Sequence, residues 1–417
     1  MTTQRLAKII CLSFLILLLV GCWDKKEIEK NAFVVAVGMD KGTDNSLTIT
    51  YLIANPNYAT QQQGGGDSVP REVITFQAND LISAKSLANT VVAKDISYDL
   101  LRYFIISENL AKDKDFIKWM YDATKDREIR RDSFLIVVKE KASKFILNNS
   151  PKLETAPHKY FEQIISRGRD IGFIPRAELH TFLRVTEADA DLFLAAFATT
   201  IHEEENSDSA TKGDLFLAGE LPSKGETNNT QFLGSAIFKE GTMIGKLNGE
   251  ETRLYYLLSN IVTAPSIVTT ISDPFQSKVK NAIRIKKYKK NDFKMERTEQ
   301  GKWKINLIVP LNIEVLTDFG MENYAKNVQK REGLKKHLEE QLTIKFDKFI
   351  KKTQEEFKGQ PFGWSLNARK HFLTIPEYKK IKWMKTYPNM EINIAVIVEF
   401  GEFGRQSKLP KLKEVRD

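Results

Sequence analysis

A short apolar segment at the start of the chain limits how the rest of it can fold. Residues 9–20 form an unbroken run of twelve residues that is apolar except for Ser13, and Arg5 and Lys8 precede it. A helix needs ~20 apolar residues to cross the hydrocarbon core of a bilayer, so this run is too short. Its length suits the apolar region of a signal peptide, commonly ~7–15 residues. Because no further transmembrane segment follows Val20, we expect the remaining chain to fold in water.

The four residues Leu19-Val20-Gly21-Cys22 resemble the lipobox of bacterial lipoproteins. The small Gly21 lets the chain enter a peptidase cleft in extended form, and Cys22 offers the thiol that a diacylglyceryl group alkylates. We therefore expect residues 1–21 to be a lipoprotein signal peptide and Cys22 to be the lipidated residue. Two acyl chains anchor a protein stably, whereas one does so only marginally. The alternative is an ordinary signal peptide in which Cys22 is incidental.

Cysteine content and charge narrow the possible chemistry. Cys11 and Cys22 are the two cysteines of the chain, so cleavage and lipidation would leave no thiol for a disulfide, a redox centre or a Cys-based zinc site. The net charge of +9 falls to +7 without residues 1–21, which carry two basic residues and no acid. This excess suits a position near an anionic membrane. Nucleic acid is not an expected partner, because no recognition motif is present.

Strand and helix patterns alternate in the first third of the chain. Turn residues at 41–45 join two apolar runs and predict a hairpin. The glutamine- and glycine-rich stretch over 56–70 has too little apolar content to pack, and we interpret it as a loop. The predicted strands cover 31–40, 46–55, 71–78, 100–107 and 133–139. Two predicted helices cover 108–121 and 142–147, and another begins at Asn79-Asp80, with its buried side formed by Leu81, Ile82, Leu87, Val91 and Val92.

The next stretch is less regular. Helices are predicted over 158–166 and 176–183, followed by a strand over 191–200. The segment 203–229 is first acidic and then rich in Ser, Gly and Asn, which indicates a linker or a protruding loop.

The last part of the chain has the sharpest patterns. A hairpin is predicted over 232–247 around Glu240-Gly241, followed by a helix over 250–258. Residues 303–315 alternate strictly, and 392–400 repeat that pattern, so each predicts a strand with one buried face. Between them, 322–357 follows a helical face. We expect Leu338 and Leu342 of this helix to pack on Ile305 and Leu307. A partner helix in a coiled coil is the alternative, but the heptad register slips.

These patterns predict an α+β fold whose last domain is an antiparallel sheet covered by a long helix. The predicted division is a signal peptide over 1–21, an N-terminal α/β domain over 22–150, a middle domain with a linker or loop over 151–230, a C-terminal α+β domain over 231–405 and a tail over 406–417.

No catalytic or cofactor-binding constellation stands out. The histidines at 158, 180, 202, 337 and 371 are never spaced as a ligand pair on one helical face. The carboxylate pairs Asp189/Asp191 and Glu339/Glu340 are interpreted as solvated rather than as a glycosidase dyad. We therefore predict no catalytic residue, no metal site and no cofactor, which leaves a cell-wall enzyme without residues to support it.

Several stretches, in their order and spacing, resemble the Ger(x)C family, the C-subunit lipoproteins of spore germinant receptors. The resemblance covers nearly the whole chain beyond the leader. The matching stretches are Gly21-Cys22-Trp23-Asp24 with Glu27-Ile28, Val37-Gly38-Met39-Asp40, residues 103–112, Glu128-Ile129-Arg130-Arg131-Asp132, residues 234–239, Gly245-Lys246-Leu247, residues 249–253, Phe362-Gly363, the long helix and the terminal strand.

The resemblance implies three mixed α/β domains and a non-catalytic function. It implies a lipoprotein, lipidated on Cys22, on the outer leaflet of the spore inner membrane. There it would assemble with membrane-spanning A and B subunits into a nutrient receptor needed for germination. The alternative function is a substrate-binding lipoprotein of an importer, which shares the lipobox. Long, alternating, half-exposed strands favour the first interpretation, because importer lobes are mostly parallel sheet.

Overall fold

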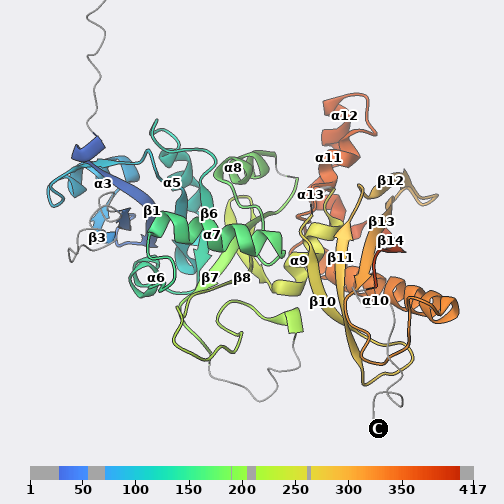
Figure 1. Ribbon diagram of the computed structural model, residues 1–417. Helices are drawn as coiled ribbons and strands as arrows, with labels where there is room; N and C mark the ends of the chain where they lie inside the picture. Colours follow the sequence, from blue (N-terminus) through green and yellow to red (C-terminus); the bar gives the residue numbers. More distant parts are fainter. Residues whose placement is uncertain (1–27, 55–70, 189, 204–212, 261–263, 404–417) are drawn as a thin grey trace, which may run out of the picture.

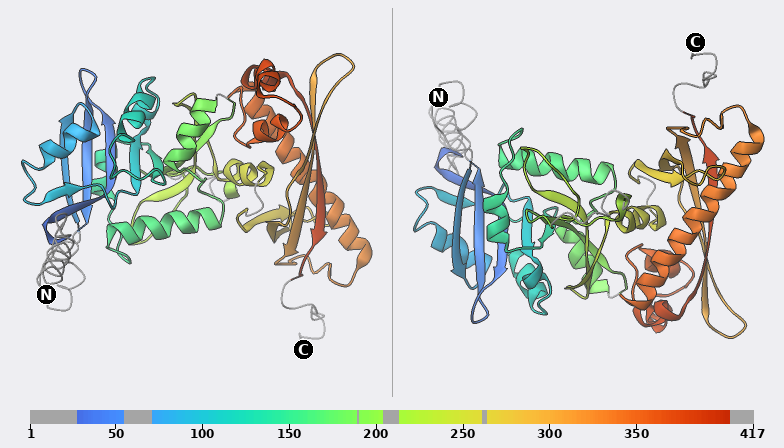
Figure 2. Two further views of the ribbon diagram at one scale, coloured as in Figure 1. Left: turned by 90° about the horizontal axis from the view of Figure 1, so that it is seen from above. Right: turned by 90° about the horizontal axis from the view of Figure 1, so that it is seen from below.

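The computed structural model describes residues 28–54, 71–188, 190–203, 213–260 and 264–403. Several predictions fall outside these ranges: the signal peptide, Cys22, the loop over 56–70, part of the segment 203–229 and the tail. Two sheets lie along the long axis of the molecule, with α9 (Gly249–Leu258) between them (Figure 2). Within the described ranges, each helix is too short or too polar to cross a bilayer.

The first sheet contains nine strands among the described residues, in the order β3-β2-β1-β5-β6-β7-β8-β9, and β4 also pairs with β1 (Figure 1). The central strands β1, β5, β6 and β7 are parallel, while both ends of the sheet are antiparallel. The strands are β1 Asn31–Lys41, β2 Leu47–Ala54, β3 Arg71–Ala78, β4 Asp95–Ser97, β5 Tyr103–Ser107, β6 Phe134–Val138, β7 Phe193–Thr199, β8 Gln231–Lys239 and β9 Thr242–Leu247.

Helices cover this sheet because its parallel strands need crossover connections. Every residue of β5, β6 and β7 is buried, as expected for strands enclosed on both faces. The elements are η1 Ile28–Lys30, α3 Leu81–Ala88, α4 Glu108–Ala111, α5 Phe116–Ala123, α6 Ala142–Asn148, α7 Pro157–Asp170, α8 Leu179–Ala188 and η3 Gly213–Leu215.

Two helix predictions in this region need correction. The single helix expected over 108–121 is broken between α4 and α5, where the Asp113 carboxylate accepts the Asp115 N–H at 2.8 Å and stabilises a turn. The helix that begins after Asp80 is also shorter than expected. It ends at Ala88, and three residues expected on its buried side are exposed: Ile82 by 48%, Leu87 by 46% and Val91 by 73%.

The hairpin predicted over 232–247 forms as β8 and β9. It pairs with β7 and so extends the first sheet, although the predicted division includes it in the C-terminal domain over 231–405. The division into three domains stays a prediction.

The second sheet and its long helix confirm the α+β class expected for the C-terminal region. Its antiparallel path is β10-β11-β13-β12, but β14 pairs with β13 in parallel, so the sheet is mixed rather than wholly antiparallel. Within this part of the described chain, the strands are β10 Ile267–Ser272, β11 Lys280–Lys287, β12 Asp292–Arg297, β13 Trp303–Val315 and β14 Glu391–Phe400. The helices are α10 Val328–Glu355, α11 Trp364–Arg369, α12 Ile375–Lys380, α13 Trp383–Thr386 and η4 Tyr387–Asn389.

Helix α10 begins later than the sequence predicted. The Asn327 side chain caps it by accepting the Lys330 N–H, so the helix starts at Val328 rather than at residue 322. Its inward residues Leu338 and Leu342 share one buried cluster with Ile305 and Leu307 of β13, which is the packing that the periodicity predicted.

A buried carboxylate joins the two halves of the molecule. Asp191, just before β7, accepts hydrogen bonds from the side chains of Gln360 and Ser365 in the segment after α10. The Leu192 N–H donates to the Gln360 carbonyl at 2.9 Å beside it. The interpretation of Asp191 as a solvated acid is therefore wrong, because polar groups that lie far away in the sequence enclose it.

Candidate functional site: a groove beneath helix α7

The site residue that the sequence predicts, Cys22, lies outside the described residues. The histidines are spread over the molecule rather than gathered. Across the described ranges, no three His, Cys, Asp or Glu side chains are placed to hold a metal ion.

At the carboxyl ends of the parallel strands β1 and β6, acidic side chains form capping interactions. This edge is where open α/β sheets usually bind ligands. At the end of β1, the Asp40 carboxylate accepts the N–H groups of Ala142 at 2.7 Å and Ser143 at 3.1 Å, at the start of α6. Just after β6, Glu140 accepts from the hydroxyls of Thr199 and Thr200, each at 2.6 Å. Both acids are thus engaged in holding the backbone.

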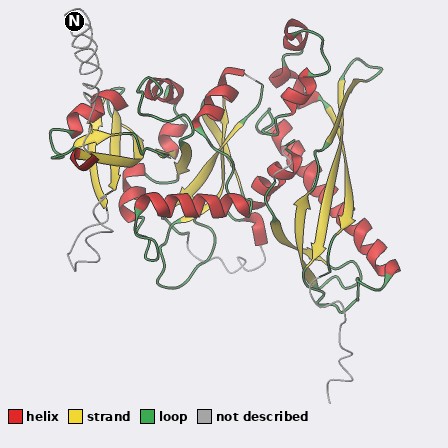
Figure 3. Ribbon diagram, turned by 45° about the horizontal axis from the view of Figure 1, so that its top comes forward, coloured by secondary structure: helices red, strands yellow, loops and turns green. Residues whose placement is uncertain are grey.

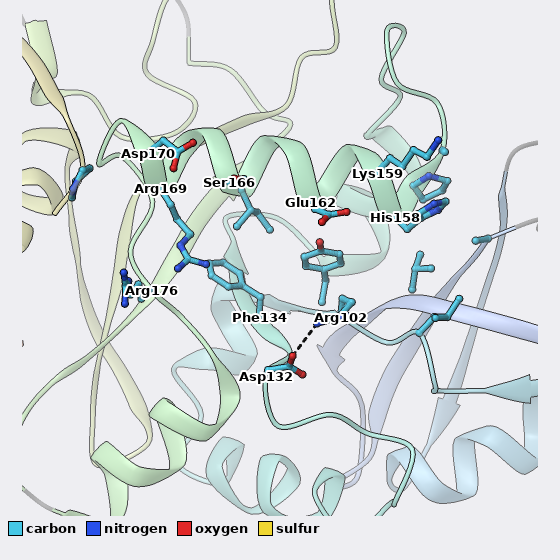
Figure 4. Close-up of a pocket in the computed structure, with 18 of the residues that line it drawn as sticks. Arg102, Asp132, Phe134, His158, Lys159, Glu162, Ser166, Arg169, Asp170 and Arg176 are labelled. Carbon is cyan, nitrogen blue, oxygen red and sulfur yellow. Dashed lines mark hydrogen bonds and ion pairs between the residues drawn. The ribbon is translucent and has the colours of Figure 1, made fainter. Parts of the chain in front are cut away.

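A large hollow lies at the opposite edge of the sheet. It is a groove of about 1240 Å³ between α7 and the amino ends of β1, β5 and β6. Figure 4 shows Glu162 and Arg169 extending from α7 into the cavity, across from Asp132 and Phe134. Its lining residues are Phe33, Val35, Ala54, Leu100, Arg102, Tyr103, Asp132, Phe134, 156–159, Glu162, Ile165, Ser166, Arg169, Asp170, Arg176, Tyr256 and 264–266.

The sequence of α7 explains why it can form this wall. Pro157 begins the helix, where its fixed backbone angle is favourable and its missing N–H costs nothing. Phe161 and Ile165 face inward, one turn apart, and the Phe161 ring lies 5.1 Å from that of Tyr103 on β5. Glu162 and Ser166 each follow one of these buried residues in the sequence. Both are exposed and line the mouth of the groove.

The charged groups of the groove are mostly paired. The Arg102 guanidinium lies 2.9 Å from the Asp132 carboxylate, and Arg169 lies 3.7 Å from Glu178. A hydrogen bond from Arg130 holds the pKa of Asp132 below its ordinary value. Burial, assisted by the charge of Glu162, raises the pKa of Tyr103 to about 12. At neutral pH Asp132 is therefore ionised and Tyr103 protonated, which suits docking through hydrogen bonds better than proton transfer.

Sequence reasoning did not identify this groove, because its walls come from segments far apart in the chain. One signal was available. Tyr103 begins one of the family-like stretches, and Asp132 ends another. Both stretches lead into buried strands, so their outer residues meet at the same edge of the sheet.

Comparisons with known proteins match both halves of the chain in order. The family described as "Spore germination protein N-terminal domain" matches residues 24–199. The family described as "Spore germination B3/ GerAC like, C-terminal" matches residues 233–404.

Individual relatives agree with this result. "Putative spore germination protein YfkR" of Bacillus subtilis (strain 168) is 21% identical over 93% of this chain and 94% of that protein. "Spore germination protein KC" of the same organism is 30% identical over 135 residues, 31% of this chain, so the match spans only a third of that protein. A solved structure, "Crystal Structure of the GerBC protein", has 16% identity and a TM-score of 0.48 over 90% of this chain and 99% of that one.

Since the two halves of the family match consecutive parts of one chain, this protein belongs to the Ger(x)C family of spore germination proteins.

Proposed function

We propose that the chain is a lipid-anchored, non-catalytic subunit of a nutrient germinant receptor. It is held on the outer leaflet of the spore inner membrane by acylated Cys22, where it docks with the membrane-spanning A and B subunits. The observation that carries this proposal is the match of both halves to spore germination domains, directly behind a lipobox-like sequence.

The physical logic of this function is placement. A lipid tether confines the body to the membrane surface and raises its effective concentration near membrane partners. The folded domains then supply contact surfaces, and the groove beneath α7 is a candidate for one of them. Its paired charges and aromatic walls resemble a docking surface, and the acids at the carboxyl ends of β1 and β6 are engaged in capping.

Replacing the tether residue tests the anchor. Cys22→Ala should leave the fold intact, release the chain from washed membranes and abolish the germination response. Cys11→Ala is the matched control, because that residue lies in the segment that cleavage would remove. A Cys22→Ala chain that still sediments with membranes in detergent-free buffer contradicts the anchor.

A pair of variants on α7 tests docking separately. Ser166 and Gln163 are both exposed on α7, but only Ser166 lines the groove. Ser166→Arg should reduce co-purification of the A and B subunits with the detergent-solubilised chain, whereas Gln163→Arg should not. Equal recovery with both variants would exclude the groove as the docking site and leave the tether unaffected.

A further inference from the structure

A basic and apolar projection rises from the C-terminal half of the molecule. We call residues 364–385, which contain α11 and α12, the α11–α12 tip. It carries six Lys or Arg residues and one acid, a net charge of +5, which is more than half of the chain's +9. All six basic residues are exposed, and none forms an ion pair within the described part of the chain. They are Arg369, Lys370, Lys379, Lys380, Lys382 and Lys385.

Apolar side chains stand exposed among these charges. Leu373 is 97% exposed, Leu366 is 51% exposed and Ile375 is 50% exposed. Exposed apolar residues within a polar surround mark an interaction surface for a protein or a membrane.

The tip is held firmly enough to present these residues. The Trp364 ring is buried and donates its N–H to the Leu258 carbonyl at 3.1 Å. The Phe372 ring lies 5.8 Å from that of Trp303 on β13, so the neighbouring Leu373 is directed outward from a packed base. The only acid, Glu377, is engaged in the capping box at the start of α12.

The tip and the beginning of the described chain lie on the same side of the molecule. In Figure 1 the dark-blue start at η1 and helix α12 both lie on the upper side, and Figure 2 shows that, seen from above, they lie toward opposite ends and opposite edges of that side. Five residues separate Cys22 from Ile28, and six Cα–Cα steps span at most about 20 Å. A tether at Cys22 therefore brings η1 near the bilayer and allows the side that bears the tip to lie against it.

The geometry points to the α11–α12 tip as a second membrane contact, specific for anionic lipid surfaces, that lays the long axis of the body along the bilayer. This inference rests on the proposed tether. Basic side chains near an anionic leaflet are attracted by its surface potential, and the exposed apolar residues insert at the headgroup boundary. An acidic protein partner would match the charge but would leave Leu373 without an apolar environment.

Single cysteines report the contact, because Cys11 and Cys22 are the chain's two thiols and both lie at the leader. The lipidated full chain carrying Leu373→Cys, labelled with an environment-sensitive dye, is reconstituted on phosphatidylcholine vesicles with or without phosphatidylglycerol. Brominated lipids should quench the dye in the anionic vesicles only. Phe319→Cys is the control. Phe319 is 80% exposed and belongs to the loop between β13 and α10, which lies on the opposite, lower side in Figures 1 and 3.

Charge reversal tests the electrostatic basis. Adding Lys370→Glu, Lys379→Glu and Lys380→Glu should abolish quenching at position 373, while the chain still floats with the vesicles. Quenching that is equal at positions 373 and 319, equal without anionic lipid, or absent at 373 in a chain that floats overturns the proposed contact. A chain that no longer floats contradicts the tether and also the contact, because the contact rests on that tether.

Discussion

The Ser365 hydroxyl donates to the Asp191 carboxylate at 2.5 Å, although the two residues lie 174 positions apart. Asp191 precedes β7 of the first sheet, and Ser365 belongs to α11 beside the second. Gln360 donates to the same carboxylate, so one buried acid organises the junction of the two halves. Burial raises the pKa of Asp191 to about 6, and the hydrogen bonds from Ser365 and Gln360 only partly oppose this effect.

The raised pKa of Asp191 predicts a pH dependence of stability. Between about pH 4 and pH 6 the unfolded chain releases a proton that the folded chain keeps, because the ordinary pKa is 3.8. The stability that this group contributes is full below about pH 4 and is lost as the pH rises through 6. Relative to Asp191→Asn, the natural chain should lose roughly 3 kcal/mol of unfolding free energy between pH 4 and pH 7. Urea unfolding at several pH values measures this difference, and parallel pH profiles of the two chains would contradict it.

Replacing Arg253 of α9 should lower the stability of the fold substantially. Its buried guanidinium lies 2.5 Å from the Asp214 carboxylate, donates to the carbonyl of Ile171 at 3.0 Å and stacks 3.6 Å above the Phe173 ring. Arg253→Met leaves Asp214 without its partner, so the free energy of unfolding should fall by about 3 kcal/mol. Arg130→Met is the control, because its ion pair with Asp132 is half-exposed and screened by water, so its loss should change stability little. Equal urea midpoints for the two variants would show that the Arg253 contacts contribute little.

Strictly periodic segments were predictable from the sequence. The alternation in β13 and β14 and the helical face of α10 each define one buried side, so the elements and the packing of Leu338 follow directly. Strand direction did not follow, because alternation is the same whether β14 pairs in parallel or antiparallel. Strand β11 was missed because polar residues fill two of its buried positions, Asn281 and Lys287.

The candidate site was less predictable than the fold. A hairpin signal such as that of β8 and β9 identifies the turn but not the neighbouring strand, so its pairing with β7 needed the structure. The groove depends in the same way on contacts between distant segments, including Tyr103, Asp132 and Tyr256. From sequence alone, a carboxylate such as that of Asp191 is expected to be exposed. Its burial is explained only by hydrogen-bond partners that lie far away in the chain.

No residue larger than glycine fits at position 234 in β8. Its φ is +94°, and a Cβ built there would lie 2.5 Å from the Leu247 carbonyl oxygen on β9. Gly234→Ala should therefore lower the free energy of unfolding by roughly 3 kcal/mol, through both backbone strain and a clash in the hairpin. Gly301→Ala separates these effects, because φ is +77° there but the space is open, so it should cost about 1 kcal/mol. Thermal unfolding of both variants measures the difference, and equal shifts would exclude the clash.

Lys287 of β11 should give the stability of the fold a second pH dependence, opposite in sign to that of Asp191. Its ammonium group is buried at the end of α9, where it donates to the carbonyls of Leu257, at 3.1 Å, and Ser259. Burial lowers its pKa to about 7, so below pH 7 the folded chain must carry a buried charge. The stability contribution of a lysine with a lowered pKa is present above its ordinary value of 10.5 and is lost as the pH falls through 7.

Lys287→Met makes this contribution measurable. Methionine keeps the apolar stem, loses the hydrogen bonds and carries no charge at any pH. The natural chain should therefore gain roughly 3 kcal/mol of unfolding free energy relative to Lys287→Met between pH 7 and pH 9, at about 1.4 kcal/mol for each pH unit. Lys286→Met, at the neighbouring exposed position, is the control for the loss of a lysine from the same strand. A flat difference for Lys287→Met would mean that water or a structural adjustment solvates the ammonium group, and the lysine would then act as an ordinary cap on the α9 carbonyls.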